Sequence, residues 1–138
     1  MPSRRRLRAA TAGQSLVEMA LVLPVFLLIL VGLFDFGRAI YTSNTISNAA
    51  RVATRVAVVD QTVVNVQDAA VEAAAGVNLQ ASDVDVTYSC TDKIVVCQAT
   101  VEIAVDYAAA TPLIHRLVGA ITLSSSSEMP IEHVHVDP

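Results

Sequence analysis

The 138-residue chain shows three successive patterns of apolar and polar positions. The first is a nearly unbroken apolar run over residues 16–34, in which Glu18 is the only charged residue. A helix rises about 1.5 Å per residue, so a run of this length spans roughly 28 Å, close to the hydrocarbon thickness of a bilayer. The run therefore predicts a transmembrane helix. Pro24 within it predicts a mild kink, because proline cannot donate a backbone hydrogen bond.

The second pattern, over residues 40–58, is a stripe of small apolar residues at helical spacing. Its apolar members are Tyr41, Ile46, Ala49, Ala50, Ala53, Val56 and Ala57. No Pro or Gly interrupts this segment, so we expect one helix over residues 15–58, membrane-embedded at first and amphipathic afterwards. Asp35 and Arg38 lie between the two parts at i, i+3 spacing, and we expect them to pair at the outer membrane surface.

A second, shorter helix is predicted over residues 63–75. Asp60 is a suitable N-cap for it, and Gly76 is suited to the C′ position at its end. Asp68 and Glu72 are four residues apart on this helix. We interpret them as part of a solvated face and not as a catalytic pair.

The third pattern begins after Gly76, where the period changes from 3.6 to 2. Apolar and polar residues alternate over residues 84–88 and again over residues 95–107, and residues 91–93 are typical of a turn. These features predict an antiparallel hairpin with one apolar face.

The predicted fold class is therefore α+β, with a long N-terminal transmembrane and amphipathic helix, a second short helix and a small three-stranded antiparallel sheet. A short helix over residues 112–118 is expected before the last strand, which begins at residue 121 and ends near residue 132. We expect three segments: a basic leader at 1–13, the long helix at 14–58 (transmembrane at about 16–34), and a small extracytoplasmic α+β domain at 60–138.

Charge is distributed unevenly along the chain, whose formal net charge is −4. Arg4, Arg5, Arg6 and Arg8 precede Gly13, whereas all 13 acidic residues follow it. Basic residues ahead of an apolar segment keep the N-terminus in the cytoplasm, so we expect a single pass with the C-terminal domain outside. An acidic exterior argues against nucleic-acid binding.

Composition and motifs give no indication of an enzyme or of a small-molecule substrate. Aromatic residues make up 4% of the chain and Trp is absent, so no aromatic-lined ligand pocket is expected. The chain contains no P-loop, no Gly-rich dinucleotide turn and no H-E-x-x-H motif. His133 and His135 have the spacing of a chelating pair, but in a polar terminal tail such residues are usually only solvated. We therefore predict no cofactor and no metal.

Cys90 and Cys97 lie in the part of the chain expected outside the cytoplasm, where disulfides persist. Each shares its strand parity with neighbouring apolar residues, so both are expected to point to one face of the hairpin near its turn. A single C-x6-C pair supplies too few ligands for a metal site, and we predict a Cys90–Cys97 disulfide.

Gly13 and Glu18 form the most specific local pattern. Glu18 lies two residues into the apolar run. A carboxylate in such a helix costs on the order of 2–3 kcal/mol, so Glu18 needs interfacial water or a partner. One interpretation places Glu18 near headgroup water. In the other, the chain is cut after Gly13 and Gln14 becomes the N-terminus, about one helical turn from Glu18. Either this ammonium group or that of a neighbouring copy then neutralises Glu18.

A short basic leader, Gly13, four residues, Glu18 and an apolar helix together resemble the class III signal of type IV prepilins and pseudopilins. The chain is similar to the TadE-like family, the pseudopilin-like minor proteins of bacterial tight-adherence (Flp-type) pilus systems. Met19 departs from the pattern, since many of these signals have an aromatic residue after the glutamate. The similar stretches are residues 13–24, 32–38, 48–55 and, more weakly, 105–113 and 121–124.

The resemblance implies cleavage between Gly13 and Gln14 by a prepilin peptidase and a role in pilus assembly or secretion. It implies that the partners are other pilins or pseudopilins, the pilus assembly complex and the lipid bilayer of the inner membrane, and that Glu18 pairs with an N-terminal amine during assembly. Two other functions remain open on the sequence alone: a signal-anchored extracytoplasmic binding module unrelated to pili, and an exported enzyme.

Overall fold

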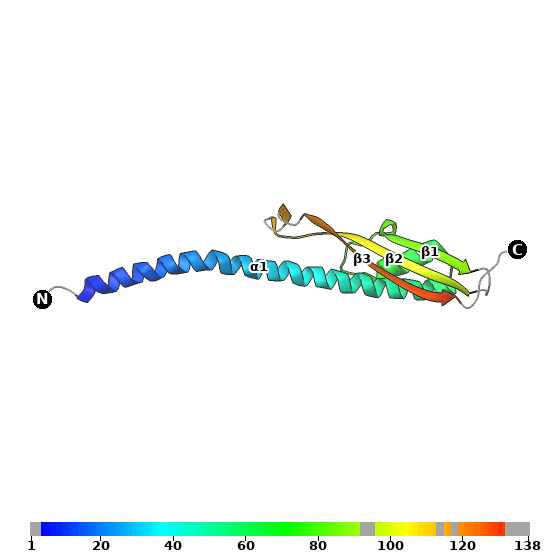
Figure 1. Cartoon of the computed structure of the whole chain (residues 1–138), viewed down its shortest axis with the longest axis horizontal. Coiled ribbons are helices and arrows are strands. Elements are labelled where there is room, and N and C mark those ends of the chain that lie inside the picture. Colours follow the sequence, from blue (N-terminus) through cyan, green and yellow to red (C-terminus); the bar gives the residue numbers. More distant parts are fainter. Residues whose placement is uncertain (1–3, 92–95, 113–114, 117–118, 132–138) are drawn as a thin grey trace. The chain divides into compact units, whose positions relative to one another are not determined.

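The computed structural model describes residues 4–91, 96–112, 115–116 and 119–131. The chain forms two compact units, Met1–Gly37 and Arg38–Pro138, and one α-helix, α1 (Arg4–Val59), contributes to both (Figure 1). The predicted long helix is confirmed, but it begins at Arg4 and not at residue 15. Its first residues include Arg, Leu and Ala and no proline, and these residue types favour helix.

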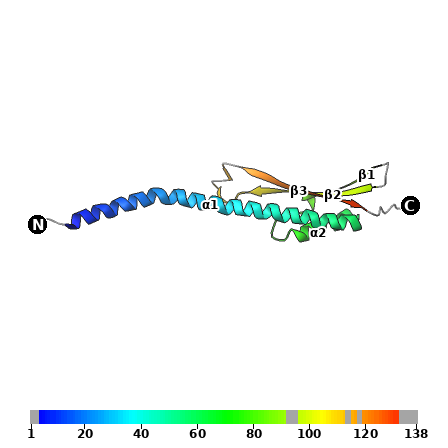
Figure 2. The same ribbon diagram turned by 60° about the horizontal axis from the view of Figure 1, so that its bottom comes forward.

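In the second unit, three strands form an antiparallel sheet in the order β1–β2–β3. The strands are β1 (Val84–Thr91), β2 (Val96–Ala108) and β3 (Ala120–Ile131). The second part of α1 and the shorter helix α2 (Val63–Ala73) lie on one face of this sheet (Figure 2). The predicted α+β class, with its second short helix and three-stranded sheet, is confirmed.

The side of α1 that meets the sheet carries mostly small residues, together with the fully buried Ile46. Ala49, Ala53 and Ala57 have no exposed surface, and they share one core with inward-facing residues of β2. The hydroxyl of Thr54 donates to the Ala50 carbonyl at 2.7 Å and to the Ser127 carbonyl at 3.3 Å. Thr54 thereby links α1 directly to β3.

Helix α2 begins where predicted, but the assignment of Asp60 as its N-cap is wrong. The N-cap is Thr62, and its side chain makes no capping hydrogen bond. Asp60 accepts hydrogen bonds from the backbone N–H of Thr62 and the side chain of Asn65. Gly76 was predicted at C′, but the C-cap is Ala74, so Gly76 lies one position further on, at C″.

Gly76 has a φ of 95°, a left-handed conformation that glycine adopts without strain. A Cβ at this position would lie 3.0 Å from the hydroxyl oxygen of Tyr41 on α1. Both the backbone conformation and the approach of Tyr41 therefore favour glycine where the chain leaves α2.

The short helix predicted before the last strand is described in part. Pro112, His115 and Arg116 are helical, and the backbone N–H of His115 donates to the Thr111 carbonyl at 2.9 Å. Several predicted features lie outside the described residues: the turn residues Asp92 and Lys93, and the histidines His133 and His135.

Candidate processing and assembly site

Gly13, Gln14 and Glu18 lie on exposed surface of α1. Residues four apart on a helix are neighbours on the same side, so the backbone nitrogen of Gln14 and the side chain of Glu18 lie about one turn apart. A Cβ added to Gly13 would meet no heavy atom within 4 Å. Packing within the described part of the protein therefore does not require glycine at this position.

The apolar run of α1 exposes large side chains in all directions. Leu16 is 72% exposed, Leu21 71% and Phe34 76%. The most apolar window of this helix has a mean hydropathy of 2.7, and none of the window is buried inside the protein. The helix continues through Pro24. This part of α1 is long and apolar enough to cross a membrane.

Asp35 and Arg38 are near the point where the apolar run ends. Asp35 is buried, with 8% of its surface exposed. The guanidinium carbon of Arg38 lies 5.8 Å from the ring centroid of Tyr107 on β2, a cation–π geometry worth about 0.5–1 kcal/mol. The ion pair between Asp35 and Arg38 stays a prediction. The contact with Tyr107 was not foreseen, because no local spacing connects residues so far apart in the chain.

A comparison with protein families identifies the region that contains these residues. Residues 13–55 match the family model described as TadE-like protein. Over these residues α1 is similar to TadE-like protein. The match begins at Gly13, the predicted cleavage residue, and ends in the amphipathic part of α1, so it confirms the predicted resemblance over this segment; the resemblance of residues 105–113 and 121–124 stays a prediction. Neither a curated protein nor a solved structure matches the chain.

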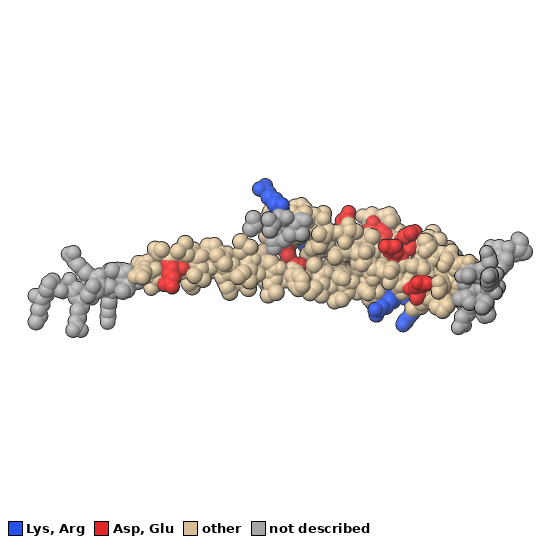
Figure 3. Space-filling model, in the orientation of Figure 1, with Lys and Arg blue, Asp and Glu red and all other residues tan. Residues whose placement is uncertain are grey.

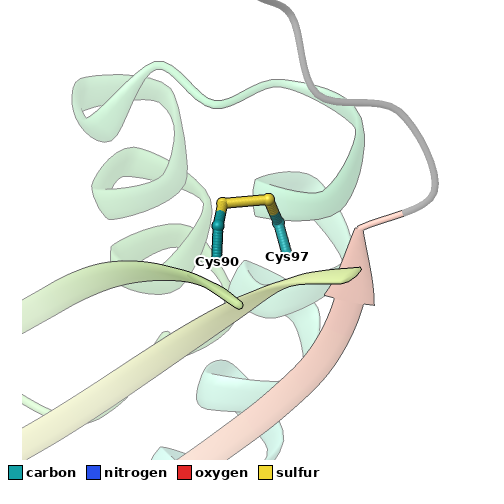
Figure 4. The surroundings of a disulfide bond; sticks show 2 residues. All are labelled: Cys90 and Cys97. Carbon is teal, nitrogen blue, oxygen red and sulfur yellow. A yellow bond between two sulfur atoms is a disulfide. The ribbon is translucent and has the colours of Figure 1, made fainter. Parts of the chain in front are cut away.

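Beyond the TadE-like segment, the hairpin carries a disulfide. Cys90 on β1 and Cys97 on β2 are direct partners in the strand register (Figure 4). Their sulfur atoms are bonded at 2.00 Å, and their Cα atoms lie 4.1 Å apart. Cys90 is exposed, whereas Cys97 is part of the core at 2% exposure. Directly opposed residues point to the same face, so the bridge lies on the packed side of the sheet, with Cys90 at its exposed margin.

Two ionisable groups in the second unit have shifted pKa values. Hydrogen bonds from Asn65 and then from Thr62 hold the pKa of the Asp60 carboxyl below its usual value. Burial, and then the negative charge of Asp60, raise the pKa of Tyr88. The Tyr88 hydroxyl has no exposed surface and no hydrogen-bond partner within the described part of the chain. Periodicity predicted that Tyr88 points inward, but it gave no information on what the hydroxyl would meet.

The described residues contain no arrangement typical of catalysis or metal binding. Among them, no group of three or more His, Cys, Asp or Glu side chains could hold a metal ion. Two open concavities lie on the second unit, of about 380 Å³ beside the end of α1 and about 340 Å³ beside β2. The first is lined by Val52, Arg55, Val56, Val59 and Asp60, and the second by Asn78, Gln80, Asp83, Ala104, Val105, Asp106 and Thr122. In the second, the Thr122 hydroxyl donates a hydrogen bond to the Asp106 carboxylate at 2.9 Å, and none of its lining residues is a His, Lys or Cys.

Proposed function

We propose that the protein is a membrane-anchored, non-enzymatic pseudopilin-like component of a tight-adherence (Flp-type) pilus assembly or secretion system. The observation that carries the proposal is the TadE-like match over residues 13–55, which begins at Gly13 and covers a helix with an exposed apolar surface. In this proposal a prepilin peptidase cuts after Gly13. The processed chain then joins other pilins or pseudopilins and the assembly complex in the inner membrane.

The open space around Gly13 supports a role for this residue outside the protein's own fold. A peptidase must approach the backbone closely at the bond that it cuts, and a side chain there would obstruct it. We expect Gly13→Val to leave an uncleaved precursor, whereas the parent begins at Gln14. Gly37→Val is the matched control, since α1 also leaves open space around Gly37, and this variant should be processed normally.

N-terminal sequencing of membrane-extracted protein, from cells that carry the peptidase, measures this directly. A parent protein that begins at Met1 or Pro2 would contradict the proposed function. Equal processing of Gly13→Val and Gly37→Val would contradict the role of glycine at the cut.

Glu18 has a separate proposed task, which is to neutralise the new amine of Gln14 on its own or a neighbouring copy. An unpaired charge in lipid is costly, so the pair favours the assembled state. We expect Glu18→Gln to be cleaved nearly normally but to lose its partners in co-purification, and Glu18→Asp, with its shorter reach, to be intermediate. If Glu18→Gln co-purifies as well as the parent, the ion-pair role is wrong.

The proposed topology places the leader in the cytoplasm and residues after Arg38 outside. Its support is the charge difference across the apolar run, where four arginines precede the run and every acidic residue except Glu18 follows it. A reporter that is active only outside the cytoplasm, fused after Pro138, should be active. Activity confined to a cytoplasmic reporter at this position would contradict the topology.

A further inference from the structure

The outer face of the sheet, turned away from the helices, carries a row of acidic side chains. Asp85 on β1 and Glu102 on β2 are direct register partners, and Glu128 on β3 lies diagonally next to Glu102. All three side chains are exposed. Like charges at directly opposed strand positions repel one another. The outward-facing positions of the described strand residues carry no Lys, Arg or His. We call Asp85, Glu102 and Glu128 the acidic face.

The opposite side of the same unit carries Arg51 and Arg55, which we call the arginine pair. Each lies two residues from Ala53, which is fully buried in the core, and two residues on an α-helix are about 200° apart. Both arginines are exposed and point away from the sheet. Their i, i+4 spacing is also repulsive. Figure 3 shows acidic atoms over the sheet side of this unit and basic atoms projecting from its lower margin, where a further acidic patch lies beside them; other basic atoms project from the upper margin.

The acidic face and the arginine pair lie at one level of the unit. The hydrogen bond from Thr54 to the Ser127 carbonyl defines that level, and the strand register continues it from Ser127 to Val101 and Val86. Every residue of the acidic face is next in sequence to one of these three strand residues, so it lies within about 3.3 Å along its strand. Both arginines lie within one helical turn of Thr54, or about 5.4 Å.

Neither charged surface is neutralised within its own copy. The arginine pair forms no ion pair with any acidic side chain that the structure describes, and the acidic face has no cation among the outward-facing strand residues. Asp68 and Glu72 are exposed acids on α2, and Asp60 lines the same concavity as Arg55. None of the three has an ion pair with these arginines in the described coordinates. Each copy therefore retains two repulsive pairs of opposite sign on opposite sides.

We propose that the acidic face of one copy docks on the arginine pair of a second copy of this chain. Copies that stand in the same orientation present the two surfaces to each other at the same level. The contact is heterologous, because different patches meet, so it can repeat from copy to copy. This contact rests on the proposed function, because a shared membrane anchor is what gives the copies a common orientation.

The contact is expected to depend on salt and on membrane anchoring. Exposed ion pairs are individually weak and are screened beyond about 8 Å at physiological ionic strength. Anchoring raises the effective concentration of neighbouring copies, which allows a weak contact to be populated.

Charge reversal on full-length protein in membranes tests the contact. The helix variant is Arg51→Glu with Arg55→Glu, and the sheet variant is Asp85→Arg with Glu102→Arg. The first has two acidic surfaces and the second two basic ones, so neither can pair with itself. When the two variants are co-expressed, the basic sheet of the sheet variant can pair with the acidic helix of the helix variant. The acidic sheet of the helix variant can likewise pair with the arginine pair of the sheet variant.

The readout is co-purification of two differently tagged copies in mild detergent at about 50 mM NaCl. We expect each variant alone to lose about tenfold in co-purified partner, and the mixture to recover the parent level. The matched control is Asp68→Arg with Glu72→Arg, which makes the same charge change on α2 and should co-purify like the parent.

Several outcomes would overturn the proposal. A reversed variant that associates alone as well as the parent would contradict it. A mixture that co-purifies no better than the single variants would also contradict it. Loss with the sheet variant only would assign the acidic face to a different basic partner. N-terminal sequencing of the same samples reports on processing separately, so failure of the proposed function is distinguishable from failure of this contact.

A charge-preserving variant covers the case in which a reversed variant does not fold. Arg51→Lys with Arg55→Lys permits zero-length coupling of the new amines to carboxylates, and mass spectrometry identifies the joined residues. We expect links from residues 51 and 55 to residues 85, 102 or 128 of another, isotope-labelled copy. Links confined to residues 68 and 72 would contradict the proposal.

Discussion

Residues 16–34 and residues 46–57 belong to the same helix, yet their side chains have different sizes and surroundings. The first segment carries large apolar side chains that are exposed, such as Leu16 at 72% and Phe34 at 76%. In the second, Ala49, Ala53 and Ala57 are fully buried against the sheet and α2. One backbone conformation therefore serves two kinds of environment.

The difference shows what each environment requires of the helix. A helix that is apolar on every side suits lipid, which adapts to large and irregular side chains. A packed sheet does not adapt in this way, and the buried side of the helix that packs on it is mostly alanine, with Ile46 also fully buried. Substitutions of equal size should thus have unequal effects in the two segments, and the predictions below exploit that contrast.

The largest effect is expected from Ala53→Leu. Ala53 has no exposed surface, and added methyl groups at this position force α1 away from β2, costing about 3 kcal/mol of the free energy of unfolding. Leu27→Ala makes the reverse change in the apolar run, where Leu27 is 50% exposed, and should leave that free energy unchanged. Urea unfolding in detergent, followed by circular dichroism, measures both. Equal effects of the two variants would contradict the division of α1.

The contrast between the two segments also explains what the sequence predicts well. The period of 2 placed β2 within one residue of its observed bounds, because a strand with one buried face must alternate strictly. The bounds of β3 were also predicted within one residue, although its serine run has no such alternation. The small-residue stripe predicted most of the buried side of α1 for the same kind of reason, but Tyr41 in it is 55% exposed, and Thr54 outside it is buried. The relative placement of Gly13 and Glu18 could be predicted because both lie on one continuous helix, where spacing determines geometry.

The features that were missed depend on choices between competing partners or on distant contacts. Asp60 bonds to Thr62 and Asn65 and does not cap α2, and spacing alone does not decide between these arrangements. The contact of Arg38 with Tyr107 joins α1 to the end of β2. A local pattern contains no information on such pairs, because the tertiary fold creates them.

The next largest effect concerns the disulfide, which constrains the second unit and leaves the apolar run untouched. A short loop closed by a disulfide is worth about 2 kcal/mol in the chain-entropy model. Reduction should therefore lower the free energy of unfolding of the second unit by about that amount without releasing the protein from membranes. The variant Cys90→Ala with Cys97→Ala is the control, since reductant should not change it further. Two alkylatable thiols in unreduced protein would contradict the bridge.

The smallest effect concerns Tyr88, a partly buried residue of β1 that packs against the core. Its hydroxyl is buried without a hydrogen-bond partner in the described part of the chain. A buried, unsatisfied hydroxyl costs about 1 kcal/mol or more. Removing the oxygen while keeping the ring should therefore stabilise the second unit, a result opposite to that of most core substitutions.

We expect Tyr88→Phe to raise the free energy of unfolding by about 1 kcal/mol near pH 8, and by more at higher pH. Burial and then the charge of Asp60 raise the pKa of Tyr88, so the folded state favours the neutral hydroxyl. The stability of the parent is thus complete below the unfolded pKa of about 10 and falls as the pH rises through the folded pKa. Phenylalanine at this position removes that loss. Urea unfolding of both proteins at about pH 8 and about pH 10.5 measures the difference, with Tyr41→Phe, at an exposed position, as the control. A difference that does not grow between these two pH values would contradict the burial of a neutral Tyr88 hydroxyl.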